Sequence, residues 1–383
     1  MVTQYDAIVL GVGGMGSAAV YHLARRGLRV LGIERYNIPH EMGSSHGLTR
    51  IIRLAYYEHP AYVPLLRRAY ELWRQLENTV QERLLIITGS IDASPVNGAV
   101  FIGSKTSCDI HHLPHEVLDH QELNARFPGY RLPAGIMALY QPDGGFLLPE
   151  RCIVAHIMAA QELGAEVHGQ ERVLGWKAKG QGVEVRTDRG RYSADKLVIC
   201  AGAWGAKLVP ELATLAVPER QVLGWFQPMR PALFRVQTFP VFNMAVEEGH
   251  YYGFPIYGIP GFKVGRYHHL EERVDPDRMD RAAHREDEDV LRRFTARYFP
   301  DAAGPTMSLK TCLFTNTPDE HFILDLHPTL PQVCIAAGFS GHGFKFCSVI
   351  GEIMADLAQT GRSRHHLELF RLQRFHEASP ALS

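Results

Sequence analysis

The sequence predicts an α/β protein with two domains, and three observations lead to this prediction. The chain has 383 residues, which is long for a single hydrophobic core. A strand–helix–strand unit with a glycine-rich turn begins at residue 5. A second strand, glycine-rich turn and helix follow near the C-terminus, at 333–360. The content of 46% hydrophobic and 21% charged residues is that of an ordinary globular protein.

The N-terminal unit has the pattern of a dinucleotide-binding fold. Residues 5–10 read as a buried strand, 14–26 as a helix and 29–34 as a second strand. The segment Gly11-Val12-Gly13-Gly14-Met15-Gly16 matches GxGxxG at the start of the helix. A helix N-terminus offers free N–H groups and partial positive charge to phosphates. The unit therefore predicts that a pyrophosphate binds at this turn.

Each glycine of the motif has a separate physical role. Gly11 permits the tight turn, Gly13 lets the backbone approach the pyrophosphate, and Gly16 allows close packing of helix on strand. Glu34 ends the second strand, where a carboxylate can accept hydrogen bonds from ribose hydroxyls. Because Glu34 would repel a 2′-phosphate, we expect a cofactor other than NADP.

The middle of the chain alternates between helical and strand patterns. A helix is predicted over 60–77, and short strands and helices alternate less regularly over 85–140. Over 150–205 the order is helix, hairpin and strand, and 218–310 is rich in aromatic residues in short alternating runs. The run Arg285-Glu286-Asp287-Glu288-Asp289 opens a helix, and we interpret its acids as a solvated helix end.

The C-terminal unit favours a flavin over a nicotinamide. Val333 to Ala337 read as a strand, Gly338 to Lys345 as a glycine-rich turn, and 349–360 as a helix. A second helix N-terminus aimed at the far end of the cofactor would stabilise negative charge there. Reduced isoalloxazine carries such a charge, whereas reduced nicotinamide is neutral. The alternative is a loop shaped only by packing.

Composition excludes several other classes of protein. The net charge of -1 argues against nucleic acid as a partner. The apolar stretch 7–24 follows Asp6 and contains four glycines, which disfavours a membrane span or signal peptide. His115 and His120 are five residues apart, which on a helix places them on different faces, so we expect no metal site.

Cysteine use and the C-terminal residues suggest the compartment. The chain has 6 cysteines and no CxxC pair, which is sparse for a disulfide scaffold and favours free thiols in a reducing cytoplasm. Ser379-Pro380-Ala381-Leu382-Ser383 is not a Ser-Lys-Leu peroxisomal address. We therefore expect a cytoplasmic protein that does not associate with membranes.

Several sequence blocks, taken together, resemble the family of monomeric sarcosine oxidase, N-methyltryptophan oxidase and pipecolate oxidase. The blocks are His46-Gly47-Leu48-Thr49-Arg50-Ile51-Ile52-Arg53, Tyr251-Tyr252-Gly253-Phe254-Pro255, Asp319-Glu320-His321-Phe322-Ile323 and Gly338-Phe339-Ser340-Gly341-His342-Gly343-Phe344-Lys345-Phe346. The resemblance covers essentially the whole chain. It implies a flavoprotein that oxidises secondary amino acids, reduces O₂ to hydrogen peroxide and works as a monomer.

The family's fold gives an expectation for the domains. It implies a Rossmann-like FAD-binding domain with an interleaved substrate domain built on a large mixed or antiparallel β-sheet. On this chain the FAD-binding domain would comprise 1–85, 145–215 and 311–383. The substrate-binding domain would comprise 86–144 and 216–310.

The resemblance also implies a covalent flavin. Cys312, in Thr311-Cys312-Leu313-Phe314, matches the cysteine that forms a thioether to the flavin 8α carbon. Taken alone, the residue could be a buried structural thiol. The family match implies a role for it in holding the cofactor and raising its reduction potential.

Further roles follow from the same matches. Arg53 and Lys345 match a pair that grips the substrate carboxylate, a suitable task for a planar guanidinium and an ammonium. Lys263 matches a lysine that activates oxygen beside flavin N5. His46 and Arg50 match residues packed against the opposite face of the flavin.

The resemblance thus yields complete sets of expected site residues. Those expected to act on the reaction are Lys263, Arg50, His46 and Tyr252. Those expected to bind substrate are Arg53, Lys345, Tyr252, Gly341, Tyr267 and Phe314. Those expected to contact FAD are Gly11, Gly13, Gly14, Met15, Gly16, Glu34, Arg35, Ser44, Arg50, Val173, Cys312, Gly341, Gly343, Phe344 and Lys345.

Two positions depart from the sarcosine oxidase pattern. Phe314 stands where those enzymes usually carry a tyrosine, and Tyr267 where they more often carry a histidine, with His268 one step later. Both changes concern the pocket for the N-substituent, so the preferred substrate is left open. Three alternatives to an oxidase also stay open: a flavin-dependent dehydrogenase with another electron acceptor, an NAD-dependent dehydrogenase, and a flavin-binding module without turnover.

Overall fold

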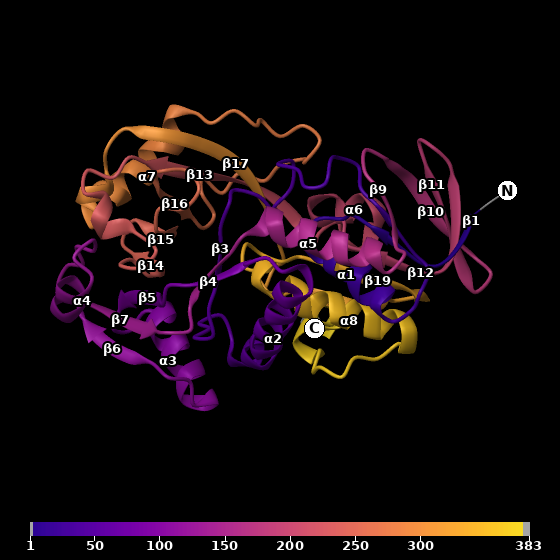
Figure 1. Cartoon of the computed structure of the whole chain (residues 1–383), viewed down its shortest axis with the longest axis horizontal. Coiled ribbons are helices and arrows are strands. Elements are labelled where there is room, and N and C mark those ends of the chain that lie inside the picture. Colours follow the sequence, from indigo (N-terminus) through magenta and orange to yellow (C-terminus); the bar gives the residue numbers. More distant parts are fainter. Residues whose placement is uncertain (1–2, 378–383) are drawn as a thin grey trace, which may run out of the picture.

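The computed structural model describes residues 3–377, which form two large sheets side by side (Figure 1). The first sheet and its helices lie on the right of Figure 1, and the second lies on the left. Residues 379–383, from which we argue against a peroxisomal address, lie outside the described residues. The prediction of an α/β fold is confirmed.

The first sheet is built around the N-terminal strand. Its order is β10-β11-β12-β1-β2-β9, with β19 also paired to β12 and β18 to β19. β1 runs parallel to both β2 and β12, as a Rossmann-like sheet requires. Its strands are β1 (Thr3–Leu10), β2 (Val30–Ile33), β9 (Glu166–His168), β10 (Val173–Lys179), β11 (Gly182–Thr187), β12 (Arg191–Ile199), β18 (Ile323–His327) and β19 (Leu330–Ala337).

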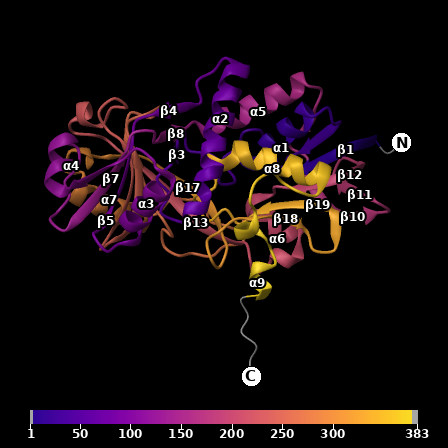
Figure 2. The same ribbon diagram turned by 90° about the horizontal axis from the view of Figure 1, so that it is seen from below.

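Two helices from opposite ends of the chain pack together on this sheet. α1 (Gly14–Arg25) and α8 (Cys347–Thr360) lie beside each other in Figure 2, and every residue of α8 up to Ala358 is buried. They approach closely because Gly351 has no side chain: a Cβ there would lie 2.5 Å from the carbonyl carbon of Ala18. α5 (Pro149–Glu162) packs against α1 as well.

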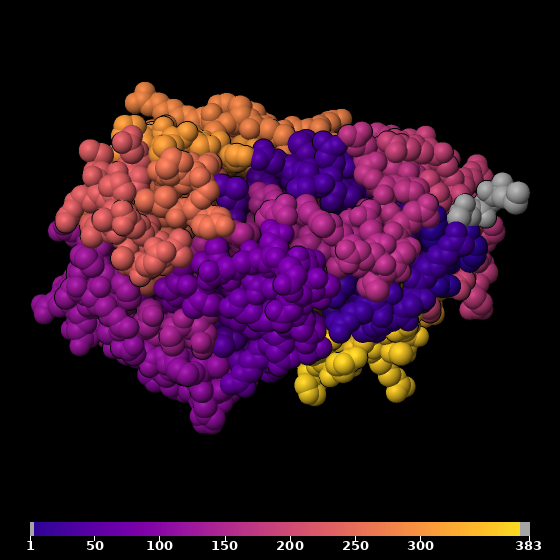
Figure 3. All heavy atoms as spheres, viewed as in Figure 1, coloured from indigo at the N-terminus to yellow at the C-terminus, as the bar shows by residue number. Residues whose placement is uncertain are grey.

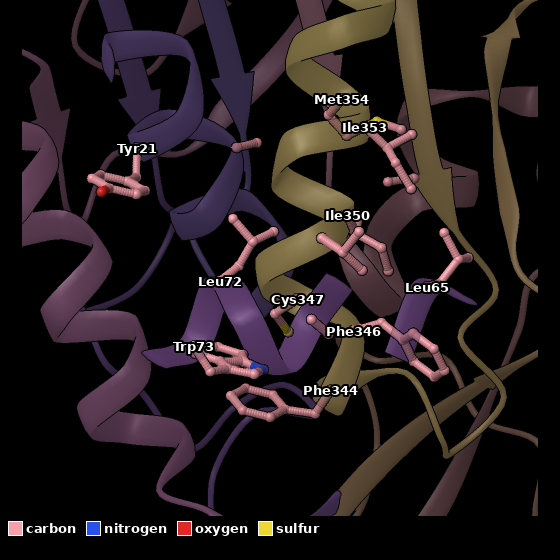
Figure 4. Close-up of a cluster of buried hydrophobic side chains, with 14 of the residues drawn as sticks. Tyr21, Leu65, Leu72, Trp73, Phe344, Phe346, Cys347, Ile350, Ile353 and Met354 are labelled. Carbon is pink, nitrogen blue, oxygen red and sulfur yellow. The ribbon is translucent and has the colours of Figure 1, made fainter. Parts of the chain in front are cut away.

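A buried cluster fixes the glycine-rich turn that precedes α8 (Figure 4). Trp73 of α2 (Val63–Val80) stacks on Phe344, with ring centroids 6.3 Å apart. Its indole N–H donates to the carbonyl of Lys345 over 2.9 Å. Cys347 fills the space above Gly14, where a Cβ would lie 2.8 Å from its Sγ. The turn is therefore held from two sides by packing.

The second sheet is mixed and carries the aromatic core. Its order is β17-β13-β16-β15-β14-β5-β7-β6, and all neighbours are antiparallel except the pair β14 and β5. Its strands are β5 (Ser90–Pro95), β6 (Glu116–Asp119), β7 (Ile136–Gln141), β13 (Val217–Phe226), β14 (Val241–Val246), β15 (Gly249–Phe254), β16 (Phe262–Arg266) and β17 (Thr306–Asn316). Strands from distant parts of the chain adjoin here, as the neighbouring purple and orange surfaces in Figure 3 show.

The remaining elements connect or cover these sheets. A small sheet of order β3-β8-β4 lies between them and consists of β3 (Arg50–Ile52), β4 (Leu85–Ile87) and β8 (Gly145–Leu147). The other helices are α3 (Ala99–His111), α4 (His120–Arg126), α6 (Gly205–Leu208), α7 (Arg285–Tyr298) and α9 (Arg374–Glu377). Cys312 lies on β17 and pairs with Gln221 in the second sheet. The predicted domain boundaries remain a prediction.

The acidic start of α7 differs in part from the sequence interpretation. The helix begins at Arg285 as expected, and Glu286 and Asp289 are exposed. Asp287, however, is buried and forms an ion pair with Arg220, with Nη2 and Oδ2 2.8 Å apart. Its other oxygen contacts His269 Nε2 at 3.0 Å. One acid of the run therefore neutralises a buried arginine.

Two further observations concern sequence segments that could be mistaken for a membrane span or a metal site. No helix within 3–377 is long and apolar enough to cross a membrane. The stretch 115–120 is a strand followed by the start of α4, and no group of three potential ligands that could hold a metal occurs among the residues described.

The contact between α1 and α8 predicts the effect of Gly351→Ala. Alanine is the better helix former by about 1 kcal/mol, yet the new Cβ would overlap the Ala18 backbone. We expect a net loss of about 1–3 kcal/mol in the free energy of unfolding, measured by denaturant titration. Gln75→Ala, at an exposed position of α2, should change it by less than about 0.5 kcal/mol. Equal stability of the Gly351 variant and the parent protein would contradict the packing described.

Candidate functional site

An elongated cavity of about 430 Å³ lies at the carboxyl ends of β1, β2 and β12. It extends from Glu34 and Arg35, past the glycine motif, to Phe314 and Gly341. The open edge of a parallel sheet, at the helix N-terminus that follows its first strand, is where dinucleotides bind in such folds. Its volume is that of a small-molecule site.

The three motif glycines have the geometry expected of them. Gly11 has φ +85°, and a Cβ on it would lie 2.6 Å from the carbonyl oxygen of Cys200. Gly13 has open space where its Cβ would be, so a ligand can approach the backbone there. A Cβ on Gly16 would lie 1.7 Å from the carbonyl oxygen of Gly11. Gly16 thus serves the packing of α1 on β1, and the other two shape the cavity.

The carboxylate of Glu34 lines the cavity and also organises its wall. It accepts hydrogen bonds from the backbone N–H groups of Val12 (2.9 Å) and Tyr36 (3.0 Å). Arg35 lies at the same end and forms an ion pair with Asp277, with Nη1 and Oδ1 2.5 Å apart. Lys207 binds the other oxygen of Asp277, also over 2.5 Å. The loop containing Asp277 therefore closes this end of the cavity.

Most of the residues expected to contact FAD line the cavity. Besides those already placed, they are Gly14, Met15, Ser44, Arg50, Val173, Gly343 and Phe344. Gly16, Cys312 and Lys345 are not part of the lining. Cys312 and Lys345 lie just beyond the inner end of the cavity, which Arg50, Phe314 and Gly341 form.

Cys312 is buried at the inner end, beside a cation. Its Sγ lies 3.6 Å from Nη2 of Arg50 and 3.7 Å from the carbonyl oxygen of Ser44. Arg50 itself donates to the carbonyls of Ser44 (2.7 Å) and Thr49 (2.9 Å). The guanidinium is thus fixed between the 44–49 loop and β17.

His46 is buried with an unusual lack of partners. Neither of its ring nitrogens has a hydrogen-bond partner among residues 3–377, and 1% of the residue is exposed. Burial, with the nearby charge of Arg50 as the next cause, lowers the pKa of His46 to about 3. The imidazole is therefore neutral near pH 7, with two polar atoms free for a ligand.

Lys263 on β16 is a buried cation with neutral acceptors only. Its Nζ donates to the carbonyl oxygens of Gly47 (2.7 Å) and Thr49 (2.8 Å) and to the Thr49 hydroxyl (2.9 Å). It also lies 4.3 Å from the centroid of the Phe254 ring. Burial, reinforced by Arg50, lowers the pKa of Lys263 well below its ordinary value. No counter-ion contacts Nζ within residues 3–377, so negative charge that approaches it would favour its protonated form.

Arg53 and Lys345 are the other two buried cations of the site. Arg53 donates from Nη2 to the Glu58 carboxylate (3.0 Å) and from Nη1 to the carbonyl of Ala55. Lys345 Nζ donates to the carbonyl of His342 over 2.6 Å. Burial lowers the pKa of Lys345 to about 7, with Glu58 acting in the opposite direction. Lys345 can thus change charge within the physiological range.

Sequence reasoning missed the two carboxylates around Arg53. Asp92 on β5 is fully buried, with Oδ1 3.5 Å from Arg53 Nε and 3.1 Å from Asn243 Nδ2. Burial raises the pKa of Asp92 to about 6. For Glu58 burial also raises the pKa, but the combined attraction of Arg53, His342 and Lys345 lowers it to about 2. Burial opposes the charge of Arg53, but both carboxylates together raise its pKa well above the ordinary value. The only sequence signal was the inward position of Asp92 in a strand.

Tyr267 and the rings that contact it form an aromatic wall near Arg53. Tyr267 stacks on His250 (centroids 4.4 Å apart) and contacts the rings of Tyr252 (5.1 Å) and Phe314 (5.8 Å). Gly341 has φ +77°, and a Cβ on it would lie 2.4 Å from the Phe314 ring. The structure thus brings together Tyr252, Tyr267, Phe314 and Gly341, including both residues that depart from the family pattern.

The comparisons with known proteins agree with this site. The model of the family "FAD dependent oxidoreductase" matches residues 6–357. The chain belongs to the FAD-dependent oxidoreductase family. The fold, the glycine motif and the cavity at the strand ends are those of a member of this family, and the prediction of a flavoprotein enzyme is confirmed.

Curated relatives and solved structures of this family cover nearly the whole chain. The chain is 41% identical to a monomeric sarcosine oxidase of Bacillus sp. (strain NS-129), over 98% of each protein. It is 36% identical to an N-methyl-L-tryptophan oxidase of Escherichia coli O127:H6, over 97% of this chain and 100% of the relative. Among solved structures, NikD, described as an unusual amino acid oxidase, has a TM-score of 0.84 at 26% identity and covers 97% of this chain. The sequence resemblance is confirmed.

The residues of the cavity fit FAD. The exposed backbone at Gly13 and the N-terminus of α1 suit a pyrophosphate, and Glu34 lies where a ribose would be held. At the other end, His46 offers two unpartnered ring nitrogens beside Arg50 and Lys263. Polar atoms that are buried without partners are costly, so a ligand there is expected.

The pKa of Lys345 predicts how anion binding depends on pH. Below pH 7 the ammonium is charged and attracts a carboxylate, whereas above pH 7 it must first take up a proton. The affinity for propionate, measured by calorimetry, should therefore fall by up to about tenfold per pH unit between pH 7 and 9. Glu58 and His342 have pKa values of about 2 and 4 and do not titrate in this range.

Lys345→Met provides the control for this dependence. The variant should bind propionate more weakly at pH 6 and with little change between pH 7 and 9. An equally steep decrease in the variant would show that another group is responsible.

Proposed function

We propose that the protein is a covalent-FAD amine oxidase for sarcosine or related N-methyl or cyclic secondary α-amino acids, with O₂ as electron acceptor. The observation that carries the proposal is the burial of three cations beside residues that line the inner end of the FAD cavity: Lys263 lies near Arg50, and Arg53 lies near Lys345, which follows Phe344. Burying a cation costs free energy unless an anion compensates its charge, so these buried cations favour an anionic ligand. The similarity to enzymes named sarcosine oxidase and N-methyl-L-tryptophan oxidase supports the proposal.

The carboxylate of the substrate binds to Arg53 and Lys345. Arg53 presents a planar guanidinium that can hold a carboxylate with two parallel hydrogen bonds. Glu58 now binds Nη2 of this guanidinium, so the incoming carboxylate has to compete with it. Lys345 adds a second positive charge from the turn before α8. This clamp fixes one end of the amino acid and thereby orients its amine.

The amine then lies between Gly341 and the aromatic wall. The backbone carbonyl of Gly341 can accept a hydrogen bond from the substrate N–H. Tyr252, Tyr267 and Phe314 exclude water and surround the N-substituent. Their rings make the pocket suited to an apolar N-methyl group or a ring methylene.

The redox chemistry requires the cofactor, and the protein supplies charge and shielding. FAD, when bound, would supply a two-electron acceptor for the C–H next to the neutral amine and, once reduced, a two-electron donor for O₂. The imine product is hydrolysed by water, which for sarcosine gives glycine and formaldehyde. The Lys263 ammonium provides positive charge where negative charge develops on oxygen, and hydrogen peroxide leaves.

Cys312 holds the cofactor in this proposal. Its Sγ is buried beside Arg50, whose positive charge can stabilise a flavin anion during attachment. Replacing the S–H bond and one 8α C–H bond by a C–S bond releases two electrons and two protons, which O₂ can accept as hydrogen peroxide. We further infer a monomer that works in the cytoplasm, consistent with the six cysteines being free thiols.

Lys263→Met tests the oxygen step. The variant keeps the length of the side chain but removes the charge, so reoxidation of the reduced flavin by O₂ should slow by about 10²–10³-fold. The rate of anaerobic reduction by an N-methyl amino acid should change far less. Stopped-flow absorbance at 450 nm measures both steps, and Lys105→Met, on the exposed face of α3, serves as the control. Unchanged reoxidation in the Lys263 variant would contradict the assignment of oxygen activation to Lys263. Slow reoxidation by O₂ in the parent protein itself would favour a dehydrogenase with another acceptor.

Cys312→Ser tests the attachment of the flavin. After precipitation with acid, the yellow colour should remain in the pellet of the parent protein and appear in the supernatant of the variant. Cys334→Ser, in a buried strand away from the cavity, is the matched control. Flavin that stays with the precipitated Cys312 variant would contradict the assignment.

A further inference from the structure

The turn that holds Lys263 has an unusual backbone conformation. Gly47 and Leu48 both have positive φ, +93° and +71°. For leucine the left-handed region is unfavourable, because its Cβ approaches the backbone too closely. Such a conformation persists only where the surroundings hold it. Other groups must therefore hold Gly47 and Leu48 in this conformation.

The carboxylate of Glu150 binds the outer side of this turn. Its Oε1 accepts from the N–H of Gly47 over 2.6 Å and from the N–H of Leu48 over 3.1 Å, and Oε2 lies 3.2 Å from the same Leu48 nitrogen. Successive N–H groups that converge in this way form a small anion-binding concavity. Here the anion is a side chain of the protein, in the first turn of α5.

Lys263 binds the same turn from the inner side. Its three hydrogen bonds go to the carbonyl of Gly47 and to the carbonyl and hydroxyl of Thr49. The N–H of Thr49 closes the turn on the Gly47 carbonyl over 2.9 Å. An anion and a cation thus hold the three residues 47–49 from opposite sides, without touching each other.

Neighbouring atoms leave the turn little room to move. A Cβ on Gly47 would lie 2.8 Å from a methyl group of Leu223, so β13 limits movement on that side. The guanidinium of Arg50 donates a hydrogen bond to the carbonyl of Thr49, and this bond fixes the end of the turn. If the negative charge at position 150 were lost, a neutral and weaker acceptor would hold the N–H groups of the turn, and the acceptors of Lys263 would shift with the backbone.

We propose that Glu150 is a positioning residue for oxygen activation, which fixes the ammonium of Lys263 by binding the N–H groups of Gly47 and Leu48. This inference rests on the proposed role of Lys263 in the reaction with O₂. Glu150 does not contact the reacting atoms in this account. It acts through a strained turn, so its loss should affect the oxygen step and leave carboxylate binding at Arg53 intact.

Glu150→Gln tests the inference with two kinds of measurement. Reoxidation by O₂ should slow about tenfold, while anaerobic reduction should change by less than about twofold. Independently of turnover, hydrogen exchange measured by mass spectrometry should increase in the peptide that covers 46–52. The double variant with Lys263→Met should be no slower than Lys263→Met alone, because both changes act on one group. Glu162→Gln, an exposed acid at the other end of α5, is the control and should match the parent protein.

The possible outcomes separate this inference from the proposed function. Normal reoxidation in Glu150→Gln, together with slow reoxidation in Lys263→Met, would overturn the role of Glu150 alone. An equal loss in both half-reactions would also overturn it, because that pattern indicates a general structural effect. Normal reoxidation in Lys263→Met would contradict the role of Lys263 on which this inference rests, whereas a parent protein whose reduced flavin does not react with O₂ would contradict the proposed function. If Glu150→Gln does not fold, Glu150→Asp, which keeps the charge on a shorter side chain, should show the same selectivity with a smaller effect.

Discussion

The buried hydrogen bonds of the Lys263 ammonium are the interaction on which the site depends. They join β16 of the second sheet to the 47–49 turn that leads into β3. β13 pairs with β16 on one side and with β17 on the other, which sets Lys263 opposite Trp225 and Cys312 opposite Gln221. The register of these strands therefore decides how the oxygen-activating charge and the attachment sulfur lie relative to each other.

Arg53, Lys345 and Lys263 differ in the groups that bind them and therefore in how firmly they hold their charge. Arg53 is paired with Glu58 and Asp92, so its charge persists in the absence of substrate. Lys345 has one carbonyl acceptor and can lose its proton near neutral pH. Lys263 has three neutral acceptors and, within residues 3–377, no ion pair, and burial lowers its pKa. These differences match the proposed tasks. A carboxylate clamp requires a cation whose internal ion pair the substrate carboxylate can replace. An oxygen site requires a positive charge that no carboxylate in direct contact neutralises.

Local patterns allowed much of the fold to be predicted from the sequence. The strand and helix periodicity around Gly11–Gly16 and around Gly338–Lys345 gave β1, α1, β19 and α8, because neighbouring residues determine those elements. The long-range contacts were not predictable in this way. Glu58, Asp92 and Glu150 are single acids without a motif, and their positions depend on which strands and turns meet in space. The interpretation of Asp287 as solvated was wrong for the same reason, because its partner Arg220 lies on a distant strand.

The proposed reaction oxidises an N-methyl amino acid and reduces O₂. The most direct measurement follows oxygen uptake, hydrogen peroxide and formaldehyde together, while the purified yellow protein turns over sarcosine and other N-methyl amino acids in air. We expect all three to change in equal amounts for at least one of these substrates. Substrates that bleach the flavin without return of its colour in air would contradict the proposed oxidase.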